Sequence, residues 1–79
     1  MPVITEIQRL GFGYAQALHI WKCLMNEVPR AIEYAKCETL YRPENRLADL
    51  AIRLNVPREW AKHFAYCALE ESGLEEIET

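Results

Sequence analysis

The sequence predicts an all-α fold: a compact bundle of about five short helices in a single domain, residues 1–79. Three observations predict it. The chain has 11 Glu, nine Ala and nine Leu, a composition that favours helices over strands. Its apolar residues recur at helical spacing, and no segment alternates between apolar and polar residues as a strand does. Prolines and glycines divide the chain into segments of helical length.

The first two helices are expected over residues 3–10 and 14–25. Gly11 lies between them, and a sharp turn between helices often needs the positive φ that glycine adopts readily. The second segment carries six apolar residues at helical spacing, so one face of this helix is expected to be buried. They are Tyr14, Ala17, Leu18, Trp21, Leu24 and Met25.

The third and fourth helices are expected over residues 29–40 and 44–54. Pro29 and Pro43 stand at or directly before their first residues. Proline suits the first position of a helix because the N–H that it lacks would have no partner there. We therefore expect the chain to leave the second helix before Pro29.

The fifth helix is expected over residues 57–72, beginning at Pro57. Asn55 and Gly73 stand beyond the ends of the fourth and fifth helices, where a left-handed residue commonly terminates a helix. The apolar stripes of these segments predict the residues of the core. The expected core residues are Leu10, Phe12, Leu18, Trp21, Ile32, Leu50, Leu54, Trp60 and Phe64.

An internal repeat indicates two related helical units, residues 3–40 and 44–79. A shift of 44 positions matches six of the 19 residues from Arg9 to Glu27, where chance would match about one. Each unit consists of a short helix, a tight turn and a long helix. Because such a unit cannot bury its apolar face alone, we expect the two to pack as a pseudo-symmetric pair. The matched residues are Arg9, Leu10, Ala17, His19, Cys23 and Glu27.

Residues 4–37 contain a series of short motifs: Ile7, Leu10-Gly11-Phe12, Ala17-Leu18, Asn26-Glu27-Val28 and Ala31-Ile32-Glu33-Tyr34. This series resembles the ubiquitin-associated (UBA) domain family. The resemblance implies a three-helix bundle that binds ubiquitin or a ubiquitin-like fold through the first turn and the end of the third helix. The candidate protein-binding residues are Leu10, Gly11, Phe12, Tyr14 and Tyr34.

The second half contains Leu50-Ala51, Leu54-Asn55-Val56, Ala61 and Phe64. Over residues 47–66 this pattern resembles the helix-turn-helix of DNA-binding domains, in which a small residue lets two helices approach and the second helix enters a DNA groove. The resemblance implies a recognition helix starting at Pro57. The alternative DNA-binding residues are Arg58, Lys62 and His63.

The charge distribution favours protein binding over DNA binding. The net charge is −3, and five of the last ten residues are Glu, which leaves residues 1–69 with a net charge of +2. Affinity for a nucleic-acid backbone depends on the number of phosphates that basic residues neutralise. In this chain the basic residues barely outnumber the acidic ones even without the last ten residues.

Two His-x-x-x-Cys pairs, His19 with Cys23 and His63 with Cys67, occupy matching positions of the repeat. Residues four apart share a helix face, so the two pairs could together supply four ligands for zinc. A cysteine within a helix is more often a small buried hydrophobic residue, and we expect no metal and no cofactor. A cysteine nucleophile is not expected either, because no third catalytic residue or pocket is apparent.

The sequence therefore predicts a non-enzymatic protein-binding module or small regulatory protein. Its partner is expected to be a ubiquitin-like or other protein. The first alternative is a helix-turn-helix DNA-binding regulator, and the second is a zinc-stabilised helical bundle. The odd number of cysteines, three, indicates reduced thiols, and no apolar run is long enough to cross a bilayer. We expect a cytoplasmic protein with no membrane partner.

Overall fold

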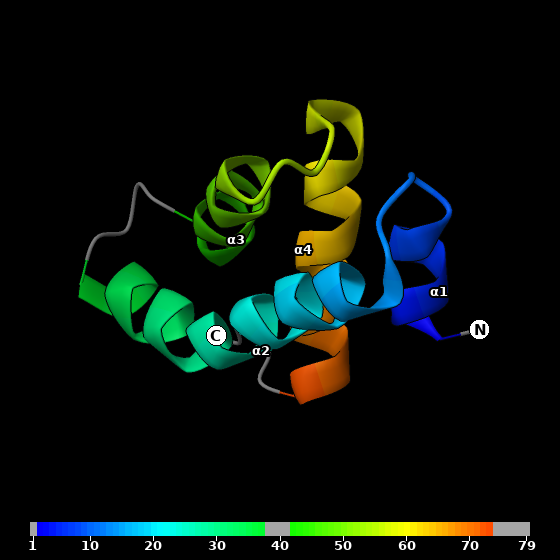
Figure 1. Ribbon diagram of the computed structural model, residues 1–79. Coiled ribbons are helices and arrows are strands. Elements are labelled where there is room, and N and C mark those ends of the chain that lie inside the picture. Colours follow the sequence, from blue (N-terminus) through cyan, green and yellow to red (C-terminus); the bar gives the residue numbers. More distant parts are fainter. Residues whose placement is uncertain (1, 38–41, 74–79) are drawn as a thin grey trace.

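The computed structural model describes residues 2–37 and 42–73, and these residues form four α-helices without any strand (Figure 1). This confirms the all-α prediction. The radius of gyration, 12.1 Å, is close to the ~12 Å of a compact chain of this length. The helices are α1 (Val3–Gln8), α2 (Tyr14–Cys37), α3 (Pro43–Arg53) and α4 (Arg58–Ser72).

Helix α2 is the scaffold of the fold, because it packs against each of the other three helices. In Figure 1 it runs across the molecule, with α1 beside its N-terminal end, while α4 crosses it and α3 packs against both α2 and α4. The chain has two corners, one between α1 and α2 and one between α3 and α4. Helix α2 contacts the helices of both corners. Within the described residues, no helix is long and apolar enough to cross a membrane.

The predicted break before Pro29 is wrong. The segments expected as separate helices over 14–25 and 29–40 form one helix with Pro29 in its interior, and residues 38–40 lie outside the described residues. The physical reason is the apolar stripe, which continues through the proline without a change of phase and is buried on both sides of it. Packing of both halves outweighs the hydrogen bond that proline cannot donate. The buried stripe is Ala17, Ile20, Leu24, Val28 and Ala31.

The other predicted boundaries agree with the structure to within about two residues. Pro43 is the first residue of α3, and Pro57 is the N-cap of α4. Arg9 already caps α1, so that helix is shorter than the predicted 3–10. Four helices instead of five therefore make up the described residues.

The core is built mainly from small residues, which lets the helices approach closely. Its large, fully buried members include Ile7, Leu24, Leu47 and Phe64, and seven buried alanines belong to the same cluster. Most of the larger residues expected in the core are only partly buried and pack against this cluster. The prediction that Trp60 belongs to the core is wrong, because 42% of this residue is exposed. Its neighbour Phe64 takes the fully buried position, one turn further along α4.

Each of the two corners has a residue with positive φ at equivalent positions of the 44-residue repeat. Gly11 has φ +112° and Asn55 has φ +74°, and each donates its N–H to the residue three positions earlier, Gln8 and Ile52. Gly73 ends α4 with φ +75°. The predictions of left-handed residues at Asn55 and Gly73 are confirmed, and each follows from the local preference of glycine and asparagine for positive φ.

Candidate functional site

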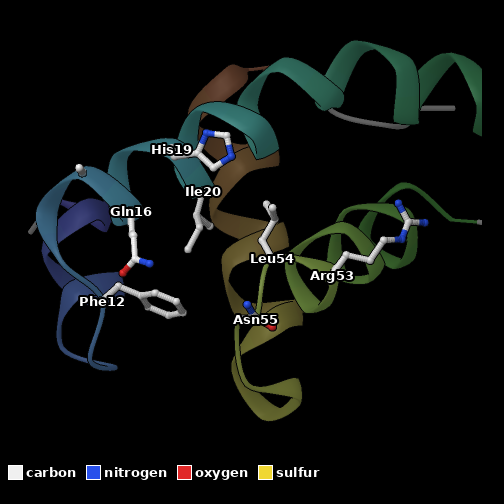
Figure 2. Close-up of a pocket in the computed structure, with 8 residues that line it drawn as sticks. Phe12, Gln16, His19, Ile20, Arg53, Leu54 and Asn55 are labelled. Carbon is white, nitrogen blue, oxygen red and sulfur yellow. The ribbon is translucent and has the colours of Figure 1, made fainter.

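A pocket of about 370 Å³ lies between the two corners and joins residues far apart in the sequence (Figure 2). Phe12 comes from the α1–α2 corner, Ile20 from the second turn of α2, and Leu54 from the α3–α4 corner. These three side chains provide the apolar surface of the pocket. The volume is at the lower end of the range for ligand sites in proteins, and suits one apolar side chain of a partner better than a large cofactor.

Polar side chains surround this apolar surface. Gln16, His19 and Asn55 are exposed lining residues, and Arg53 lines the side formed by α3. The Gln16 Oε1 atom accepts a hydrogen bond of 3.3 Å from the N–H of Gly13, which caps the start of α2 and leaves the Gln16 amide nitrogen as a donor. Among residues 2–37 and 42–73, no Asp or Glu lines this pocket. The site therefore combines an apolar surface with hydrogen-bond donors and one cation.

The predicted protein-binding residues do not form one surface. Phe12 lines the pocket, Gly11 forms the corner beside it, and Leu10 packs partly against the core. Tyr14 is 59% exposed at the start of α2 but does not line the pocket. Tyr34 is 20 residues further along the same helix, a distance of about 30 Å at the helical rise per residue.

Tyr34 instead takes part in the contact between α2 and α3. The Arg46 guanidinium lies 4.9 Å from the centre of the Tyr34 ring, and Arg46 Nε donates a 2.8 Å hydrogen bond to Glu27 Oε2. Glu27 also lies 3.8 Å from Arg30. A cation over an aromatic ring and a carboxylate shared by two arginines are stabilising contacts. They give this end of α2 a structural role.

The three alternative DNA-binding residues do not lie on one surface either. Arg58 and Lys62 line a groove of about 380 Å³ between α3 and α4, together with the acidic Asp49. His63 lies on another side of α4, where its Nε2 is 3.0 Å from Glu6 Oε1 of α1. Only two of the three residues therefore share a surface, and a carboxylate lies on that surface with them.

The two His-x-x-x-Cys pairs form within their own helices but do not meet. Cys23 Sγ lies 3.6 Å from His19 Nε2, and Cys67 Sγ lies 3.8 Å from His63 Nε2. Among residues 2–37 and 42–73, no three His, Cys, Asp or Glu side chains come together in an arrangement that could hold a metal ion. The structure thus does not bring the two pairs into one four-ligand site.

The environment of Cys67 works against a role as a nucleophile. Its partial burial, and after that the negative charges of Glu6, Glu70 and Glu71, raise the pKa of the Cys67 thiol. Reactive cysteines have the opposite setting, in which positive charge or a helix N-terminus stabilises the thiolate. Glu6 and Cys67 also approach the same nitrogen of His63, whereas a catalytic histidine uses one nitrogen for each partner.

We expect iodoacetamide at pH 8 to alkylate exposed Cys37 well before Cys67. Only the thiolate reacts, and a raised pKa lowers the thiolate fraction of Cys67 at this pH. Mass spectrometry of quenched samples measures each site separately. Unfolding in guanidinium should remove the difference, and equal rates at the two cysteines in the folded protein would contradict the expectation.

Several residues of the pocket were not predicted from the sequence as parts of a site. Ala15, Gln16 and Arg53 have no motif of their own, and Asn55 was assigned only to a turn. One signal was available: Arg53 and Leu54 repeat Arg9 and Leu10 after 44 positions, and Asn55 takes the place of Gly11. That match marked the second corner as the counterpart of the first, but not as its neighbour in space.

A comparison with models of known protein families, with curated proteins and with solved structures finds no match to this chain. The function is therefore inferred from the geometry of the chain itself. Two surfaces combine a concave shape with polar or charged side chains and are therefore candidate binding sites. They are the pocket between the corners and the groove lined by Arg58 and Lys62.

Proposed function

We propose that this chain is a non-enzymatic, cytoplasmic protein-binding module that uses the pocket between its two corners. The observation that carries the proposal is a concave apolar surface, formed by Phe12, Ile20 and Leu54, with polar side chains at its edge. Protein-binding sites typically combine a central apolar anchor point with a polar rim. The three free cysteines support a reducing compartment such as the cytoplasm.

The proposed partner is a protein, with a ubiquitin-like fold as one candidate because of the UBA resemblance. In that family the binding surface combines the first turn with the end of a third helix. Here the corresponding residues, Phe12 and Tyr34, lie at opposite ends of α2. The pocket therefore supports binding through the corner, and ubiquitin is a specific ligand to include in a binding test.

We also propose that residues 3–40 and 44–79 are two related helical units. Support comes from the corners, where Gly11 and Asn55, 44 residues apart, both have positive φ and both donate their N–H to the carbonyl three residues earlier. The starts of α2 and α4, at Tyr14 and Arg58, differ by the same 44 residues. In this arrangement the pocket forms where the corner of one unit faces the corner of the other.

The alternative function is a helix-turn-helix DNA-binding regulator. Its support is the corner between α3 and α4, in which Asn55 is left-handed and Val56 is buried, followed by Arg58 and Lys62 on the exposed side of α4. Asp49 in the same groove weakens the attraction to phosphates. A zinc-stabilised bundle has less support, because His19 and Cys23 lie apart from the second pair.

An affinity capture with matched variants tests the proposal. Ala15 is exposed at the edge of the pocket, in the first turn of α2, so Ala15→Glu adds a bulky charge there while the helix N-terminus tolerates it. Asn26→Glu makes the same charge change about 16 Å further along α2. We expect wild type and Asn26→Glu to retain the same protein from source-cell lysate, identified by mass spectrometry, and Ala15→Glu to lose it.

The same proteins serve to test DNA binding. At low salt, a random-sequence duplex should show no tight, salt-sensitive mobility shift, and Arg58→Ala or Lys62→Ala should change nothing. Tight binding that falls steeply with salt and is lost in these two variants would replace the proposed function by the DNA-binding alternative. In the capture experiment, retention of identical proteins by wild type and Ala15→Glu would also overturn the proposed function.

A further inference from the structure

We propose that the pocket between the corners binds an acidic, hydrophobic segment of its protein partner: one apolar side chain enters the pocket, and a carboxylate next to it in the partner pairs with Arg53. This inference rests on the proposed function and specifies the chemistry of the partner. It follows from the apolar surface of the pocket, from the donors at its edge, and from the position of Arg53.

The apolar part of the pocket selects the anchor residue. Figure 2 shows the Phe12 ring, Ile20 and Leu54 around the opening, which lies between the corner before α2 and the corner before α4. Phe12 and Leu54 are only half-buried in the chain alone, so a partner side chain seated here would remove further apolar area from water. An aromatic or branched aliphatic side chain gains most from such burial.

The edge of the pocket selects the charge of the flanking residues. Gln16 offers its amide nitrogen and Asn55 its amide group, while no Asp or Glu of the part of the chain that the structure describes lines the pocket. Acceptor oxygens of a partner are therefore better matched here than donors. A basic segment would find no carboxylate among the described residues at this edge.

Arg53 is placed for a carboxylate beside the anchor residue. Its side chain lines the pocket from α3, and in Figure 2 its guanidinium lies to the side of the opening, away from Phe12. Arg53 and Glu27 both line a further recess of about 140 Å³, but Glu27 already pairs with Arg46 at 2.8 Å. Among the described residues no carboxylate forms an ion pair with Arg53. A carboxylate next to the anchor residue could therefore reach this guanidinium.

A peptide titration followed by amide NMR tests the inference on the full chain. The probes are Gly-Ser-Glu-Phe-Glu-Ser-Gly, a form with both Glu replaced by Gln, and a form with Phe replaced by Ala. We expect the first peptide to shift the amides of Phe12, Ala15 and Leu54. The Ala form should bind at least about tenfold more weakly, since it loses the buried ring. The Gln form should bind about two- to fivefold more weakly, the range for an exposed ion pair.

Arg53→Gln identifies the partner of the carboxylate. We expect this variant to bind the Glu peptide as weakly as wild type binds the Gln peptide, and to bind the Gln peptide as wild type does. Arg9→Gln is the matched control, because Arg9 is the exposed counterpart of Arg53 in the repeat and lies outside the pocket. If Arg53→Gln weakens both peptides equally, the carboxylate contact is wrong.

The remaining outcomes separate this inference from the proposed function. If no peptide shifts the pocket amides while Ala15→Glu still loses the captured protein, the acidic segment is wrong and the protein-binding function stands. If Ala15→Glu also retains the captured protein, both the acidic segment and the protein-binding function are wrong.

Two other occupants of the pocket are tested by the same amides. Shifts on raising the protein concentration alone would assign the pocket to a second copy of the chain, and shifts caused by a random DNA duplex would assign it to nucleic acid. Either result overturns the inference.

Discussion

Replacing Phe64 by alanine is expected to lower the free energy of unfolding by about 3–5 kcal/mol, the usual cost of removing a fully buried phenylalanine. Phe64 is 0% exposed and contacts two other rings, Trp60 at 6.1 Å and His63 at 5.0 Å between centroids. The cavity left by alanine would remove support from both. Urea denaturation followed by circular dichroism measures the loss, which is a large part of the stability of a small domain.

Tyr66→Ala is the matched control for this prediction. Tyr66 lies two residues further along α4 and is 49% exposed, so its removal should change the free energy of unfolding by no more than about 1 kcal/mol. Phe64→Leu provides a second measurement if the alanine variant does not fold, and should cost less than alanine because it leaves a smaller cavity. Equal losses for Phe64→Ala and Tyr66→Ala would show that α4 does not bury this face.

Replacing Pro29 by alanine is expected to raise the free energy of unfolding by about 2 kcal/mol. Proline inside a helix costs about 3 kcal/mol relative to alanine, partly offset because proline also restricts the unfolded chain. Pro29 lies in the middle of α2, where it cannot donate to the carbonyl of Met25. The melting temperature should rise by roughly 8–16 °C, measured by circular dichroism.

The control is Pro57→Ala, because Pro57 is the N-cap of α4 and interrupts no helical hydrogen bond. This variant should be neutral or slightly less stable than wild type. If Pro29 opened a separate third helix, as its place in the sequence suggested, Pro29→Ala would behave in the same way as Pro57→Ala. Stabilisation by Pro29→Ala alone therefore supports one continuous α2.

The candidate site was predictable from the sequence only in part. Phe12 was identified through the resemblance to a UBA domain, as part of the Leu10-Gly11-Phe12 turn, and a residue at such a corner is held by its neighbours in the chain. Tyr34 was grouped with it by resemblance to a three-helix domain, but one continuous helix keeps the two apart. Arg53 and Asn55 carry no signal for a site apart from the repeat, because their contribution to the pocket depends on where the second corner lies.

What the sequence determined by itself is the all-α class, the starts of the four helices to within one residue, and the corners. Gly11, Asn55 and Gly73 adopt positive φ because their own side chains permit it, and proline starts α3 because its ring and missing N–H suit that position. These are local preferences, and a residue carries them in any fold. They can therefore be derived from the residue and its immediate neighbours.

Only the tertiary structure decided which preferences prevailed and which residues met. The preference of Pro29 for a helix start was overridden, because Val28 and Ala31 on either side of it are buried in one continuous stripe. The pocket arose because both corners pack near the same part of α2, which brings Phe12 and Leu54 together across 42 residues of sequence. The burial of a residue and its neighbours in space depend on all the helices that pack around it. They cannot be derived from any single segment of the sequence.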